Sequence, residues 1–101
     1  MTDGAPFWIW DPAKNAANRH IHGLSFETAA LVFDDPLAVT IEDPYPYEQR
    51  WRTVGMVGTV LLMVVHTWPE RDVDTGNEVG RVISARKATS RERNAYEEGA
   101  C

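Results

Sequence analysis

An almost continuous apolar run over residues 60–68 restricts most strongly how this chain can fold. Its uninterrupted part, Val60 to Val65, is far too short to cross a membrane. The run also lacks the alternation of a half-exposed strand, which favours a central strand covered on both faces. Gly58-Thr59, just before it, suits a two-residue hairpin turn with glycine first. A second strand is predicted over 51–57, so the centre of the molecule should be a β-hairpin.

The other elements follow from capping and periodicity. Asp11-Pro12 predicts the start of a helix that ends before Gly23, and Ser25 caps a second helix. Thr89-Ser90-Arg91-Glu92 is a capping box for a last helix. Residues 43–49 and 69–77 are predicted as exposed loops. The predicted elements are strand 7–10, helix 12–22, helix 26–33, strands 37–42, 51–57, 60–68 and 78–86, and helix 90–98.

This order, β-α-α-β-β-β-β-α, predicts an α+β fold in which an antiparallel sheet packs against two N-terminal helices and one C-terminal helix. At 101 residues the chain is expected to form one domain, 1–101, with an ordered core of about 7–98. The first residues lack a basic segment followed by an apolar one, so no secretory signal is expected and a cytoplasmic location is the default. The single cysteine, Cys101, excludes an internal disulfide.

A basic segment stands out against the formal net charge of −5. Residues 81–93 hold five of the ten basic residues and predict a strand that leads into a capped helix, a fixed surface suited to anions. In a regular strand Arg81 and Arg86 would lie on opposite faces. They can share a site only if the strand ends or bulges near Ser84-Ala85. A solvated edge charge is an equal alternative for Arg81, whereas Arg86 is the stronger functional candidate.

The histidines are open to more than one interpretation. His66 interrupts the apolar strand near its end, where it is either a core group with satisfied hydrogen bonds or a general acid or base. His22 most simply caps its helix, and His20 and His22 diverge by about 200° on a helix, so they cannot chelate one metal. No zinc-ligand cluster, glycine-rich phosphate loop or Ser-His-Asp spacing is present, so we expect no metal and no cofactor.

Lys14 and Arg52 are each surface charges when taken alone, but together with Arg81 and Arg86 they could surround one concave face of the sheet.

Several segments, taken together and in this order along the chain, resemble the BrnT toxin family over roughly residues 7–97. They are Trp10-Asp11-Pro12-Ala13-Lys14-Asn15, Asn18, His22-Gly23-Leu24-Ser25-Phe26, Ala29, Val32-Phe33-Asp34-Asp35, Arg52-Thr53-Val54-Gly55, Val64-Val65-His66-Thr67, Arg81-Val82-Ile83-Ser84-Ala85-Arg86-Lys87-Ala88, Glu92-Arg93 and Tyr96.

The resemblance implies a ribonuclease toxin of a type II toxin–antitoxin system, with a RelE-like fold, that cleaves RNA and inhibits translation. It implies a ribbon-helix-helix antitoxin, BrnA, as partner, and contact with DNA only through that antitoxin. Ile21 stands where the family commonly has lysine, and the pI near 5 implies weak electrostatic steering to RNA. The site residues that follow are Arg81, Arg86, His66 and Glu78 for catalysis, and Lys14, Arg52, Lys87 and His22 for RNA binding.

Two functions from different classes remain at this point. The first is metal-independent cleavage, in which a 2′-hydroxyl attacks the adjacent phosphate while cations stabilise the developing charge and other groups move protons. The second is a non-catalytic interaction module that binds an antitoxin-like partner and modulates the partner's DNA binding. Acidic residues between 34 and 48 disfavour direct DNA contact on that side of the molecule.

Overall fold

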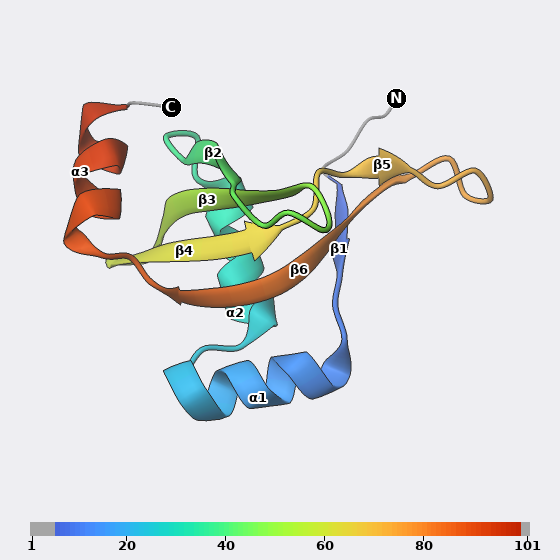
Figure 1. Ribbon diagram of the computed structural model, residues 1–101, viewed down its shortest axis with the longest axis horizontal. Coiled ribbons are helices and arrows are strands. Elements are labelled where there is room, and N and C mark those ends of the chain that lie inside the picture. Colours follow the sequence, from blue (N-terminus) through green and yellow to red (C-terminus); the bar gives the residue numbers. More distant parts are fainter. Residues whose placement is uncertain (1–5, 100–101) are drawn as a thin grey trace.

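The computed structural model describes residues 6–99, which form one curved sheet with helices on both sides (Figure 1). The first residues of the chain and Cys101 lie outside the described part. The strands are β1 (Phe7–Ile9), β2 (Val39–Asp43), β3 (Arg50–Val57), β4 (Val60–His66), β5 (Glu70–Arg71) and β6 (Glu78–Lys87). The sheet order is β1-β6-β4-β3-β2, and β5 pairs with β6 beside this path. All pairs are antiparallel except β1 with β6, which is parallel and makes the sheet mixed.

The first and last helices begin and end where the capping signals predicted. Helix α1 (Pro12–His22) starts at Asp11, whose side chain accepts a hydrogen bond from the Ala13 amide, and ends at Gly23 with φ of 67°. A left-handed residue at this position favours glycine. Helix α3 (Ser90–Glu98) has the complete capping box between Thr89 and Glu92. No helix within residues 6–99 is long and apolar enough to cross a membrane.

The α+β class is confirmed, but the sheet is mixed where an antiparallel one was predicted, because β1 pairs in parallel with β6, and several elements differ locally from their predicted bounds. The second helix is a short α2 (Phe26–Ala29) that tightens into a 3₁₀ segment, η1 (Ala30–Asp34), where the Asp35 amide donates to the Val32 carbonyl. The apolar strand ends at His66 instead of residue 68. The loop predicted over 69–77 contains the two-residue strand β5, because Glu70 and Arg71 pair with the start of β6.

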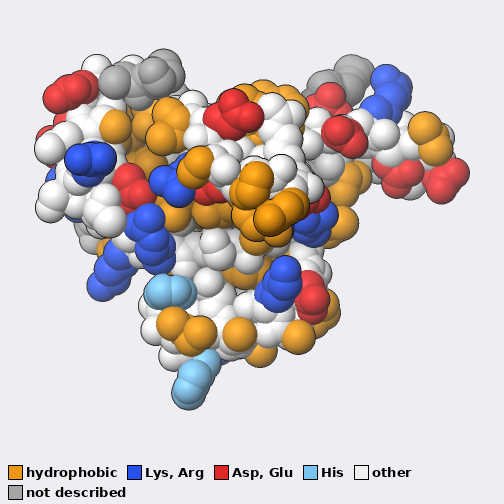
Figure 2. All heavy atoms as spheres, in the orientation of Figure 1, with side chains coloured by type: hydrophobic (Ala, Val, Ile, Leu, Met, Phe, Trp, Pro, Cys, Tyr) orange, Lys and Arg blue, Asp and Glu red, His pale blue; other side chains and the backbone are white. Residues whose placement is uncertain are grey.

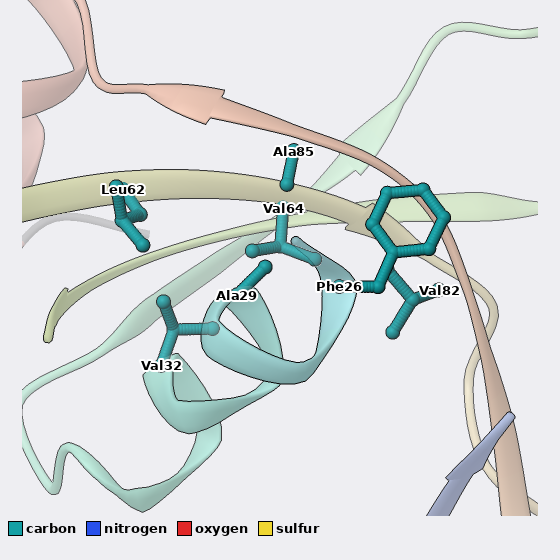
Figure 3. Close-up of a cluster of buried hydrophobic side chains, with 7 residues drawn as sticks. All are labelled: Phe26, Ala29, Val32, Leu62, Val64, Val82 and Ala85. Carbon is teal, nitrogen blue, oxygen red and sulfur yellow. The ribbon is translucent and has the colours of Figure 1, made fainter. Parts of the chain in front are cut away.

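Strand β4 is covered on both faces, as its apolar run predicted. On one face it joins a core of seven buried side chains beneath α2 (Figure 3), and we call this side the helix-covered face. These residues are Phe26, Ala29, Val32, Leu62, Val64, Val82 and Ala85. On the other face Leu61 and Met63 pack with Val39 and Val54, and Ala88 and Tyr96 at the α3 end cover this second cluster.

Strand β6 contains the irregularity on which the placement of its arginines depends. Val65 of β4 pairs with Ser84, but the next residue, His66, pairs with Val82, so Ile83 is an extra residue in β6. Such a bulge reverses the alternation of side chains beyond it. Val82 and Ala85, three residues apart, consequently belong to the same buried core. Arg81 and Arg86 therefore project from the same, opposite face.

Candidate functional site

Four arginines lie on the face opposite α2, and we call this set the arginine face: Arg50 and Arg52 from β3, and Arg81 and Arg86 from β6. The register fixes their arrangement. Arg52 and Ser84 flank Val65 of β4 on either side, about 10 Å apart at their Cα atoms given the usual strand spacing. In the orientation of Figure 2 this face is toward the viewer, and Lys and Arg side chains gather over the junction of β6 and α3.

Arg81 and Arg86 project from the same face of the sheet but start from well-separated positions along β6. They are five positions apart in the extended strand, which puts their Cα atoms about 15 Å from each other. The backbone at Arg81 is held on both sides by Thr67, whose amide donates to the Arg81 carbonyl and whose Oγ1 accepts from the Arg81 amide at 2.9 Å. The arrangement suits two separate phosphates of an extended strand better than one phosphate held by both arginines.

Arg86 is held by the first turn of α3. Its Nη1 donates to Glu92 Oε1 at 2.8 Å and its Nη2 donates to Oε2 at 2.9 Å, a bidentate pair. Glu92 is itself fixed because it closes the capping box with Thr89. Burial raises the pKa of Glu92, but the hydrogen bonds from Arg86 and Thr89 outweigh it and keep the pKa below its usual value. The same pairing raises the pKa of Arg86.

Arg81, Arg50 and Arg52 are also paired with carboxylates. Arg81 Nη2 donates to both oxygens of Glu48, at 2.7 and 2.9 Å, and Arg50 Nε donates to Glu48 Oε1 at 3.0 Å. These hydrogen bonds, Arg81's first, lower the pKa of Glu48. Arg52 Nε donates to Asp43 Oδ2 at 2.7 Å. Three carboxylates thus face four guanidinium groups, which leaves the face with a formal charge of only +1.

His66 lies on the helix-covered face, away from the arginines. It is buried, and its ring meets Trp8 and Phe33 edge to face. Nδ1 lies 2.8 Å from the Thr67 carbonyl, so it must carry the proton, and Nε2 then accepts from Thr53 Oγ1 at 2.6 Å. Burial lowers the pKa of His66 and keeps the ring neutral. Of the two interpretations of His66, these contacts support the satisfied core group.

The other expected site residues lie elsewhere. His22 and Lys87 come together along a groove of about 190 Å³, but Lys87 pairs with Leu62 and so belongs to the helix-covered face. Lys14 is exposed on α1, which packs on the same side. Glu78 is exposed at the start of β6, where it pairs with Arg71 of β5. The structure brings together Arg52, Arg81 and Arg86 and separates them from the remaining five.

The residues missed from the sequence are the partners of the arginines. Glu92 is recognisable from the sequence as a helix cap, but its contact with Arg86 depends on the angle at which α3 leaves the sheet. Glu48 and Asp43 belong to a loop and a strand end with no local motif. Asp35 accepts hydrogen bonds from the Met56 amide and Tyr96 Oη, which lower its pKa and anchor α3 to the sheet. No local sequence pattern predicts hydrogen bonds between residues so far apart in the chain.

Comparison with known families identifies the chain. The family model described as "Ribonuclease toxin, BrnT, of type II toxin-antitoxin system" matches residues 10–92, a range that includes the whole arginine face and Glu92. A search of curated proteins found no matching relative. Within the described residues, no group of three or more His, Cys, Asp or Glu side chains is placed to hold a metal ion.

Proposed function

The chain belongs to the BrnT family of ribonuclease toxins of type II toxin–antitoxin systems, and we propose that its arginine face cleaves RNA without a metal ion. The observation that carries the proposal is the bulge at Ile83, which brings Arg81 and Arg86 to one face with Arg52. A guanidinium stays charged at any relevant pH and donates two parallel hydrogen bonds to a phosphate. An extended RNA strand laid across this face would meet these arginines in turn.

The chemistry that fits this surface is internal transfer at phosphorus. The 2′-oxygen of a ribose attacks the adjacent phosphorus and loses its proton, while the bond from phosphorus to the 5′-oxygen breaks and that oxygen gains a proton. Negative charge builds on the phosphoryl oxygens during the attack, where a fixed cation is most effective. Arg86 is the cation we assign to this position, because α3 fixes its geometry. Arg52 and Arg81 would position the neighbouring phosphates.

The carboxylates explain how an acidic chain can bind RNA. Each arginine is already aligned by Asp43, Glu48 or Glu92, so little side-chain entropy remains to be lost when a phosphate binds. Among the described residues Arg81 uses only Nη2 in its side-chain hydrogen bonds, so its other donors can reach a phosphate. The low net charge of the face predicts weak long-range steering and dependence on close contact.

A direct test is to incubate the purified protein with single-stranded RNA in excess EDTA. We expect cleavage to continue in the chelator, and its loss would overturn the metal-free mechanism. Arg86→Ala should reduce the cleavage rate at least about a hundredfold, the usual cost of removing one charge-stabilising donor. Arg19→Ala, an exposed change on α1, is the matched control and should cleave at the wild-type rate. Equal rates for Arg86→Ala and wild type would remove Arg86 from the site.

We also propose that cleavage inhibits translation, and that a ribbon-helix-helix antitoxin of the BrnA type neutralises the toxin and carries the complex to DNA. The family assignment and the ordered motifs support this proposal. Expression of the chain alone should arrest growth and depress amino-acid incorporation, and co-expression of a neighbouring ribbon-helix-helix protein should relieve both. Unimpaired growth with abundant folded protein would favour the non-catalytic interaction module instead.

A further inference from the structure

Beyond the arginine face, the sheet ends in a cleft of about 370 Å³, and Arg81 is the one of its lining residues that the proposed cleavage mechanism uses. It lies between the start of β3, the residues that follow β4, and the paired strands β1 and β6. Arg81 belongs to both surfaces, since it lines the cleft and stands on the arginine face. A volume of this size falls at the small end of the range for ligand pockets. Six of its lining residues are Glu48, Gln49, Trp51, Thr67, Trp68 and Arg81.

Two indole rings form the aromatic wall of the cleft. The ring centroids of Trp51 and Trp68 are 5.2 Å apart with the planes tilted by 60°. Trp68 is 57% exposed, although it directly follows two residues that are mostly shielded from solvent. An exposed indole beside a hollow is a surface on which another flat ring can stack. Stacking on aromatic side chains is how proteins hold unpaired bases, and it tolerates any base because each has a π-face.

Polar groups suited to a nucleotide surround this wall. Trp51 Nε1 is buried and, within residues 6–99, is the one buried side-chain donor without an acceptor. Such groups are rare in folded proteins and call for a specific explanation. At the rim, Arg81 and Glu48 remain 42% and 37% exposed in their side chains, so both can contact a bound molecule. Gln49 and Thr67 add donors and acceptors that can meet the edge of a base.

We propose that this cleft is a subsite for an unpaired nucleobase of the RNA, stacked on Trp68, with the phosphate attached to that nucleotide held by Arg81. The proposal rests on the proposed function in taking RNA as the ligand, and it adds a second anchor about 15 Å along β6 from Arg86. An RNA strand that occupies both places must be single-stranded over that span. Preference for single strands then follows from the base subsite, and the arginine face alone would not impose it.

The test uses a short RNA with 2′-O-methyl groups throughout, which cannot undergo attack by a 2′-hydroxyl, labelled with fluorescein for anisotropy. Trp68→Ala should weaken its binding about tenfold or more, as loss of one stacked base does, while Trp68→Tyr should bind within about threefold of wild type. Val73→Ala, which shortens another highly exposed apolar side chain that does not line the cleft, is the matched control. Circular dichroism confirms that each variant is folded.

Abasic substitution then identifies the contact. When the RNA carries an abasic residue at the position that enters the cleft, its affinity for the wild-type protein should fall by the same factor as the Trp68→Ala substitution causes. Its affinity for Trp68→Ala should fall no further, because the stacking contact is already absent. Equal binding by wild type and Trp68→Ala, no binding by wild type, or an identical Trp68→Ala defect at every abasic position would each overturn the subsite. A nucleoside 5′-monophosphate that binds as tightly as the oligonucleotide would also overturn it, because the ligand would then be a free nucleotide.

Cleavage of unmodified RNA is measured separately, so the two proposals can fail independently. If the protein cleaves RNA but Trp68→Ala binds RNA as tightly as wild type, only the subsite proposal is overturned. If RNA binding depends on Trp68 but the protein cleaves no RNA, only the proposed reaction is overturned.

Discussion

The two faces of the sheet are stabilised by different interactions. The helix-covered face is closed by α2 and holds a fully buried apolar core, with His66 as a neutral, doubly hydrogen-bonded polar group. The arginine face has an apolar cluster at its α3 end and a layer of paired charges over the rest. Burial of apolar surface contributes far more to stability than partly exposed ion pairs do. We infer that the first face maintains the fold and that the second is free to carry the chemistry.

The largest expected effect comes from the helix-covered core. Phe26 is fully buried, and its ring meets Trp10 edge to face. Phe26→Ala should lower the free energy of unfolding by about 3–5 kcal/mol. This is a large part of the total free energy of unfolding of a domain of this size. Urea unfolding followed by tryptophan fluorescence measures it. Phe7→Ala, at a position 58% exposed, is the control and should cost less than about 1 kcal/mol. Similar costs for the two variants would contradict the division between the faces.

His66→Gln separates stability from activity. The variant should lose about 1–3 kcal/mol, because Thr53 and the Thr67 carbonyl lose well-placed partners. At a temperature where it is folded, it should still cleave RNA at close to the wild-type rate, since His66 lies on the face away from the arginines. The control, His20→Gln, changes an exposed side chain. A folded His66→Gln protein that cannot cleave RNA would return His66 to the catalytic site.

The pH dependence of stability provides a second measurement on His66. Its pKa in the folded protein is lowered from 6.5 by burial, so between that lowered value and 6.5 the unfolded chain binds more protons than the folded one. Wild-type stability should therefore fall as the pH drops below about 6.5, and His66→Gln should be flat in this window. A separate hollow of about 290 Å³ is lined by both His66 and Asp34, so among residues 6–99 Asp34 is the other titratable group that lines it. Protonation of the carboxylates with lowered pKa weakens the fold only at more acidic pH; these are Glu27, Asp35, Asp43, Glu48 and Glu92.

Local signals in the sequence are sufficient for the elements whose ends are fixed within one turn. Asp11, Gly23 and the capping box act within one turn of helix, so α1 and α3 have the predicted bounds. The helix over 26–33 was wrong in its second half because its tightening into a 3₁₀ segment depends on packing against β3, which lies far along the chain. The parallel pairing of β1 with β6 likewise joins segments some 70 residues apart.

The site was harder to predict than the fold, for a related reason. The alternation of β6 showed that Arg81 and Arg86 needed a bulge to share a face, and the structure places that bulge at Ile83, next to the expected position. The sequence could not show that His66 faces away from the arginines, because that depends on the register of β4 with its neighbours. Lys87 faces away from Arg86 because β6 continues one residue beyond the predicted end and its alternation includes Lys87. The carboxylates that hold the arginines could not be identified either, since each pair is closed by tertiary contacts.

Glu92→Gln tests whether the carboxylates restrain the arginine face. Glutamine also fits a capping box, so α3 should keep its start, and the lost charge pair should cost only about 1 kcal/mol because both partners are partly exposed. The glutamine side-chain oxygen still accepts a hydrogen bond from Arg86 and keeps it aligned. The loss of one negative charge beside Arg86 should therefore tighten the binding of uncleavable RNA, by up to about fivefold. Anisotropy at fixed salt measures this. Glu97→Gln, an exposed change on the same helix, should have less effect, and equal effects would indicate only a general change in net charge.

The smallest expected effect distinguishes contact from general attraction. Arg52→Gln should change stability by less than about 0.5 kcal/mol, because its pair with Asp43 is partly exposed. If Arg52 contacts one phosphate, the slope of log binding constant against log salt should become shallower by about 0.7, the value for a single strand. Arg19→Gln removes the same charge from α1, on the helix-covered side, and should leave the slope unchanged. Equal slopes for both variants would mean that RNA responds to the charge of the whole molecule, and the distinction between the two faces would then concern stability alone.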